Sequence, residues 1–224
     1  MILSVATLLA VAQTPAAMPP AQIGITAPAS ATIRNDPSSF DLAGFRLGMT
    51  EDEVQSAIRK RGMTVKRRSR VVDFETSVRH ALNAVDGSGG RDGGRSVLES
   101  ATLDDSKGGT VHLKLLGWPG GARVSNVTYE VPPGTPAAAW RDMLVAKYGT
   151  ASGSERVNGD RFDAAWCARA GDCAFDAGQF RLRADVGRDG GTIRLTQPEG
   201  TRSRLGDAVA TEVARRRRRG TPSL

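Results

Sequence analysis

The chain has 224 residues, which is long enough for one large domain or two small ones. Apolar residues make up 39% of it and charged residues 25%, so we expect a packed core. Collagen-like and fibrous classes are excluded because the glycines follow no repeat. The 31 basic and 24 acidic residues give a net charge of +7, which favours anionic partners and does not bear on the fold.

Residues 1–12 are apolar and end in Ala10-Val11-Ala12, the small-x-small pattern of a signal-peptidase site. Cleavage as late as residue 17 fits as well. The stretch is too short for a membrane-spanning helix, which needs about 20 apolar residues, and no other segment is apolar enough. We therefore predict a signal peptide, a disordered linker over residues 13–39, and a periplasmic or secreted location. The competing interpretation is an apolar N-terminus on a cytosolic protein.

The two cysteines, Cys167 and Cys173, are close in sequence. In an oxidising compartment such a pair predicts a disulfide bond. A thioredoxin-type redox pair would need the spacing C-x-x-C, which is absent here. A zinc site would need more soft ligands, and His80 and His112 lie far away in sequence. The pattern therefore favours a structural disulfide, with no metal and no cofactor.

Residues 40–132 are predicted to form a first half, in which helices precede an antiparallel sheet. Thr50 and Glu53 have the spacing of a capping box, in which each side chain binds the backbone of the other residue. This motif predicts a helix over residues 51–61, and Gly62 supplies its stop.

A second helix is predicted over residues 74–85, because Asp73 can cap it and apolar residues recur at helical spacing. After a glycine-rich loop the apolar period changes to two. Residues 111–115 and 127–131 alternate on either side of a Pro-Gly-Gly turn, which predicts a β-hairpin, and residues 97–103 are predicted to add a strand before it.

Residues 133–200 are predicted to form a second half of similar order. Thr135 is the expected cap of its helix, with Pro136 in the first turn, and Gly149 ends that helix. A polar loop follows. Alternating apolar residues then predict three strands, at 162–166, 180–186 and 193–195.

The two halves together predict an α+β fold, with helices packed on an antiparallel meander sheet. Both halves place a helix before antiparallel strands, which indicates a degenerate tandem duplication. The basic segment at residues 201–224 follows, with a C-terminal helix expected over residues 203–218.

The sequence Phe45-Arg-Leu-Gly-Met-Thr50, followed by Glu53 and Val54, resembles the start of BamE/SmpA-type envelope domains and of β-lactamase inhibitor protein. In those families a Gly-Met-Thr turn begins a short helix that packs on an antiparallel sheet. The resemblance implies that Gly48 and Thr50 shape the helix start and that the protein works in the cell envelope. BamE-type proteins are usually lipoproteins, and this chain has no cysteine before Cys167. The resemblance assigns no binding residue.

Two basic clusters are candidate contacts for an anionic surface or a partner, and a solvated face is the competing interpretation of both. Trp118, in the Pro-Gly-Gly turn, is a candidate exposed anchor. Nucleic acid is not expected, because export argues against it and no aromatic residues interleave with the basic ones. The first cluster consists of Arg59, Lys60, Arg61, Lys66, Arg67, Arg68 and Arg70, and the second of Arg215, Arg216, Arg217, Arg218 and Arg219.

No sequence pattern indicates a nucleophile with its base, a catalytic carboxylate pair or a metal cluster. We therefore predict a non-catalytic exported interaction or scaffold protein, with another envelope protein as its partner. The alternative is a binder of anionic lipid or lipopolysaccharide through the basic clusters. A third hypothesis, a cryptic hydrolase, requires a deep pocket that brings a histidine against a carboxylate and a serine.

Overall fold

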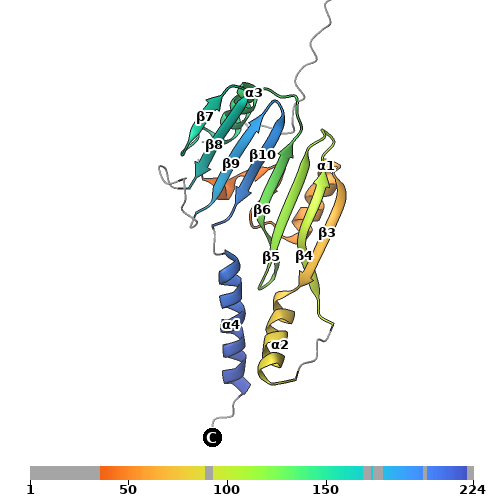
Figure 1. Cartoon of the computed structure of the whole chain (residues 1–224). Helices are drawn as coiled ribbons and strands as arrows, with labels where there is room; N and C mark the ends of the chain where they lie inside the picture. The colour runs from red at the N-terminus through yellow and green to blue at the C-terminus, as the bar shows by residue number, and fades with distance from the viewer. Residues whose placement is uncertain (1–35, 89–92, 169–172, 174–178, 199–200, 221–224) are drawn as a thin grey trace, which may run out of the picture.

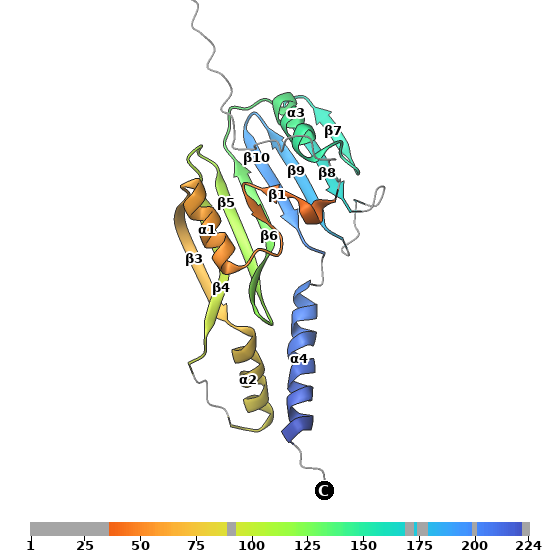
Figure 2. The same cartoon turned by 180° about the vertical axis from the view of Figure 1, so that it is seen from behind.

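The computed structural model describes residues 36–88, 93–168, 173, 179–198 and 201–220. Its centre is one eight-stranded antiparallel sheet with the strand order β3-β4-β5-β6-β10-β9-β8-β7 (Figures 1 and 2). The predicted signal peptide and nearly all of the predicted linker lie outside the described residues. The strands of the large sheet are β3 (Thr64–Val72), β4 (Ser96–Asp104), β5 (Thr110–Trp118), β6 (Gly121–Val131), β7 (Glu155–Asn158), β8 (Arg161–Cys167), β9 (Arg181–Gly187) and β10 (Gly190–Thr196).

The two halves of the chain have equivalent topology. In each, a helix precedes four strands that pair in sequence order, and the last strands of the halves, β6 and β10, pair with each other at the centre of the sheet. The α+β prediction is therefore confirmed, and the halves share one continuous sheet. The helices are α1 (Glu51–Arg61), α2 (Phe74–Val85), α3 (Ala137–Tyr148) and α4 (Thr201–Gly220); a small sheet is formed by β1 (Asp41–Leu42) and β2 (Phe45–Arg46), after the short turn η1 (Pro37–Ser39).

Of the helix N-caps predicted from the sequence, that of α1 is confirmed and that of α3 is wrong. Thr50 Oγ1 accepts a hydrogen bond from the Glu53 amide at 3.2 Å, and the Glu53 carboxylate accepts one from the Thr50 amide at 2.7 Å, so the predicted capping box is present. The predicted cap of α3 is wrong, because Pro136 and not Thr135 is the N-cap and no side chain caps this helix. A capping side chain reaches amides only two or three residues ahead, and α3 begins one residue too late for Thr135.

Two edge strands lie where the sequence predicted none. β3 contains much of the first basic cluster, and β7 lies in the predicted polar loop. An edge strand pairs on one side only and tolerates charged residues on both faces, so it lacks the apolar alternation by which strands are predicted. Irregularities in the β3–β4 pairing, after Val65 and after Ser69, disturb the alternation further.

The core lies on one face of the sheet, under α1, α3 and the β1–β2 pair (Figure 2). Its largest side chains are completely buried, and the polar atoms of two of them have partners. Trp166 Nε1 donates to the Gly149 carbonyl at 2.8 Å, and the Tyr148 hydroxyl donates to the Asp41 carbonyl at 2.6 Å. These bonds attach α3 to β8 and to β1, so one core holds both halves together.

Helices α2 and α4 lie side by side beyond one end of the sheet (Figures 1 and 2). The α2 cap is as predicted, since Asp73 Oδ1 accepts a hydrogen bond from the Thr76 amide at 2.8 Å. Phe74 and Val78 of α2 are buried, and Leu205 and Val209 of α4 line a groove against β3 and β5. Helix α2 is inserted between β3 and β4 of the first half, and α4 follows the last strand of the second half, so this helix pair lies outside the repeated unit.

Candidate functional site: the open face of the sheet

The second face of the large sheet is open. In the described part of the chain, no helix covers this face, whereas α1 and α3 cover the other (Figure 1). Successive side chains of a strand point to opposite faces. In the five central strands β4, β5, β6, β10 and β9, the residues of the core cluster therefore mark the core face and the residues between them mark the open face. On β8 the open-face residues Ala165 and Cys167 are buried with Cys173 in a separate small cluster. In β9, Leu182, Ala184 and Val186 are buried, while Arg183 is exposed. The open face is consequently polar.

Cross-strand register arranges these polar side chains in rows. Each row crosses β4, β5, β6, β10 and β9 in that order. Two rows end in arginine, and they are followed by a third that carries acidic residues. The first row is Thr102, His112, Thr128, Arg194 and Arg183; the second is Ser100, Lys114, Asn126, Thr196 and Arg181; the third is Asp104, Thr110, Glu130, Thr192 and Asp185.

The open face is hollowed over β9 and β10. This cavity has a volume of about 210 Å³, and every residue around it is polar or charged. Three arginines dominate the lining, which indicates affinity for an anion. The lining residues are Arg181, Arg183, Asp185, Thr192, Arg194 and Thr196.

Two carboxylates hold part of this positive charge. Arg183 Nη2 lies 2.9 Å from Asp163 Oδ2, and Arg161 donates from Nε and Nη2 to Asp185 Oδ1 at 3.0 and 2.6 Å. Asp185 raises the pKa of Arg161 through these hydrogen bonds. Among the described residues, neither Arg181 nor Arg194 has an acidic partner. Two guanidinium groups at the cavity are therefore available to a ligand.

His112 lies in the middle of the same face. Its Nδ1 is 3.3 Å from Thr102 Oγ1, and its Nε2 is 3.0 Å from Glu130 Oε1. A histidine thus stands between a hydroxyl and a carboxylate, which the hydrolase hypothesis required, but the hydroxyl belongs to threonine. The side chains of His112 and Glu130 are 38% and 55% exposed, so the contact lies on the surface of the sheet and not in the deep pocket that the hydrolase hypothesis required. Because Thr102 is directly opposite His112, a cross-strand polar ladder accounts for the contact.

The first predicted basic cluster is divided between two elements. Arg59, Lys60 and Arg61 form the last turn of α1, and the other four residues belong to β3. Three of those four have partners within the fold, and Arg67 lies opposite Thr102 at the sheet edge. The partners are Asp104 for Lys66 at 2.8 Å, Gln55 for Arg68 at 3.0 Å and Glu51 for Arg70 at 2.8 Å.

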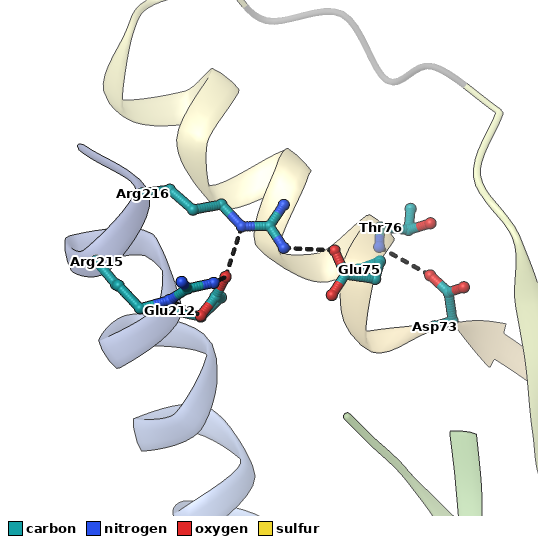
Figure 3. Close-up of polar contacts among 6 residues, drawn as sticks. All are labelled: Asp73, Glu75, Thr76, Glu212, Arg215 and Arg216. Carbon is teal, nitrogen blue, oxygen red and sulfur yellow. Dashed lines mark hydrogen bonds and ion pairs between the residues drawn. The ribbon is translucent and has the colours of Figure 1, made fainter. Parts of the chain in front are cut away.

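The second basic cluster begins within an ion-pair network that joins α4 to α2 (Figure 3). Glu212 accepts hydrogen bonds from Arg215 Nε at 2.7 Å and from Arg216 Nε at 2.6 Å. Arg216 Nη2 also lies 2.6 Å from Glu75 Oε2 on α2. The bonds from the two arginines lower the pKa of Glu212 to about 2. Arg215 and Arg216 therefore take part in holding α4, while residues 217–219 complete its last turn.

Replacing Glu212 with glutamine is expected to loosen α4, because Arg216 loses the carboxylate that aligns it with Glu75. Amide hydrogen exchange should become faster in α4 and α2 and stay unchanged in the sheet. The same contribution should be complete above pH 4.5 and fade as the pH falls towards 2, because the pKa of Glu212 is lower in the folded state. Glu155→Gln is the matched control, since it removes an Arg–Glu pair with Arg141 at the opposite edge of the sheet. Unchanged exchange in α4 would contradict the expectation.

The predicted disulfide bond between Cys167 and Cys173 is present. Both cysteines are buried and pack against Ala165. Cys167 is directly opposite Arg181 of β9, so the bond fixes the chain beside the cavity. Trp118, the candidate anchor, is half-buried at the end of β5, opposite Gly121.

The arginines of the cavity were not among the site residues predicted from the sequence. Arg181 and Arg183 were only the residues between apolar positions of a predicted strand. The signal that could have found them is the hairpin register, which places Arg194 opposite Arg183. That register can be predicted from the turn between β9 and β10. The depth of the cavity cannot be predicted from this turn.

The fold and this face together define an α+β protein whose antiparallel sheet has one covered and one open face. No protein-family model, curated protein or solved structure matches the chain. Each helix in the described ranges is either too short or too polar to span a membrane. The same residues contain no group of three or more side chains that could hold a metal ion.

Proposed function

We propose that this chain is a non-catalytic, exported interaction protein of the cell envelope, which binds a partner protein through the open face of its sheet. One observation carries the proposal: across five strands, charged and polar side chains stand in ordered rows on a face that no described helix covers. Strands fix the positions of these side chains, so a partner meets a preformed surface. Basic rows beside an acidic row would orient that partner, because complementary charge patterns give specificity.

Export is supported by two features. The Cys167–Cys173 disulfide fits an oxidising compartment, and the apolar residues 1–12 fit a signal peptide. The resemblance of residues 45–54 to BamE/SmpA-type domains supports a place in the envelope. Mass spectrometry of the mature protein should show loss of the N-terminal segment and an intact disulfide; an intact Met1 with free thiols would refute export.

Site-specific photo-crosslinking in cells tests the proposed surface. A photoreactive residue in place of Thr128, at the centre of the open face, is expected to give one dominant protein adduct. The matched control is Ala138, an exposed residue of α3 on the covered side of the sheet. Equal adducts at both positions, or none from the open face, would refute the proposal.

A second candidate function is binding to an anionic lipid or lipopolysaccharide surface. It is favoured by the position of residues 217–219, three arginines at the far end of α4, which projects from the sheet (Figure 1). Each basic residue near such a surface contributes about 1 kcal/mol. Co-sedimentation with anionic vesicles should weaken steeply with salt and after deletion of residues 217–219. Salt-independent sedimentation would refute this candidate.

A further inference from the structure

We infer that Arg181, Arg183 and Arg194 form a carboxylate-binding site on the open face, which takes an aspartate or glutamate side chain of a partner protein. The inference rests on the proposed function and names the chemistry by which the surface recognises its partner.

Three like charges lie close together at the site. Arg183 and Arg194 are directly opposite each other on β9 and β10, and Arg181 precedes Arg183 by two residues on the same face. Side chains that are directly opposite have Cβ atoms about 5 Å apart, where like charges destabilise a sheet. Of these three arginines, only Arg183 has an acidic partner among the described residues, namely Asp163. A bound anion would relieve the remaining repulsion.

The side chains around the cavity supply hydrogen-bond donors that suit a carboxylate. An arginine side chain offers five N–H donors in a planar fork, which matches the two oxygens of a carboxylate. The hydroxyl groups of Thr192 and Thr196 line the same cavity. Its volume of about 210 Å³ admits a side-chain carboxylate together with several waters, since a water takes about 30 Å³ in the liquid. The cavity therefore suits the end of one side chain, presented by a larger molecule.

The site keeps a net positive charge. Four arginines at the site carry +4 and two aspartates carry −2, which leaves +2. This net charge attracts an anion, and a partner protein presents one as the carboxylate of an aspartate or glutamate side chain. The aspartates hold Arg161 and Arg183, and Arg181 and Arg194 remain for the ligand. The residues counted are Arg161, Arg181, Arg183, Arg194, Asp163 and Asp185.

The acidic row lies beside the site on one side only, so it restricts how an acidic partner segment can lie across the sheet. Glu130 is directly opposite Thr192, and Asp185 is opposite Thr192 on the other side. An acidic segment would be repelled from this row and attracted along the row that leads to Lys114. The partner segment should therefore carry its carboxylates on the side of Arg181 and Lys114.

The test uses the full mature chain and a blocked hexaglutamate peptide, with binding measured by backbone NMR shifts at constant ionic strength. We expect saturable shifts centred on β9 and β10, and about tenfold weaker binding for Arg181→Gln and for Arg194→Gln, since each removes charge-assisted hydrogen bonds. Arg79→Gln on α2 is the matched control, because it removes the same charge away from the sheet. Unchanged affinity in both cavity variants, or equal loss in Arg79→Gln, would overturn the inference.

Two further arms complete the test. Inorganic phosphate, added at the same total concentration of negative charge as the peptide, should bind more weakly than the peptide. Equal or tighter phosphate binding would overturn the carboxylate assignment. Arg194→Gln should unfold at the same or a higher temperature, because it removes a like-charge pair; a clear decrease would mean that Arg194 is structural and would also count against the site. Crosslinking from Thr128 without peptide binding would refute this inference alone, and peptide binding without crosslinking would refute the proposed partner surface alone.

Discussion

Replacing Trp166 with alanine is expected to lower the free energy of unfolding by about 3–5 kcal/mol, the usual cost of removing a large aromatic side chain from a core. Trp166 is completely buried on β8. Its indole N–H donates to the Gly149 carbonyl at the end of α3, and its ring meets the edge of the Tyr148 ring with centroids 6.0 Å apart. The substitution would leave a cavity and an unpaired carbonyl at the joint between α3 and the sheet.

Urea unfolding of the two proteins measures this cost, with the m-value as a check that the transition remains cooperative. Trp118→Ala is the matched control, because it removes the same side chain from a half-buried position at the end of β5. We expect the control to cost clearly less. Equal costs at the two positions would contradict the described core.

Alkaline pH is expected to destabilise the fold from about pH 10 upwards, by up to about 1.4 kcal/mol per pH unit for each of two tyrosines. Tyr129 and Tyr148 are the two tyrosines of the chain, and both are buried. Burial raises the pKa of both, and the charge of a nearby carboxylate raises it further, Asp105 for Tyr129 and Asp41 for Tyr148. Tyr129 also donates a hydrogen bond to Asp105 at 2.8 Å.

The sign follows from proton binding. Above pH 10 an unfolded tyrosine has lost its proton while the folded one keeps it, so the unfolded state binds fewer protons and stability falls as the pH rises. Below pH 10 the contribution is complete. The ultraviolet absorbance of tyrosinate measures ionisation directly, and native protein should show little of it at pH 10.

Tyr129→Phe and Tyr148→Phe provide the controls, since each should remove about half of the alkaline loss of stability. Gly109 closes the Tyr129 site, because an added Cβ would collide with the Tyr129 hydroxyl. An absorbance change in native protein with a midpoint near pH 10 would show that at least one of the two hydroxyls is open to water, contrary to the structure.

Elements formed by local interactions were predictable. The α1 capping box joins Thr50 to a residue three positions away, and the β9–β10 hairpin closes through a turn of glycines and polar residues. Helix α2 follows from its cap and its apolar period. In each of these elements the stabilising contacts lie within a few residues, so the sequence alone carries the signal.

Elements formed by distant contacts were not predictable in the same way. β3 is a strand because β4 pairs with it across the inserted α2. Its own residues are mostly exposed, and four of its nine residues are basic. β7 likewise depends on β8. Edge strands gain their hydrogen bonds from one neighbour and have little apolar surface to bury, which removes the period that reveals interior strands.

The candidate site likewise depends partly on local contacts and partly on distant ones. Its charges are present in the sequence, and local hairpin geometry is sufficient to bring Arg194 opposite Arg183. The continuous rows of the open face, however, depend on the pairing of β6 with β10, which joins the two halves and extends the rows from β10 to His112 and Lys114.

The α+β class, the main helices, the central hairpins and the disulfide can be predicted from the amino-acid sequence, because they depend on short-range periodicity, capping and spacing. Which basic side chains become neighbours depends on the tertiary structure. The residues of the first basic cluster lie on two elements, α1 and β3. Arg216 pairs with Glu75 and so attaches α4 to α2, and three other arginines line a cavity. The physical reason is that side chains become neighbours through strand pairing and helix packing, which bring distant positions into contact.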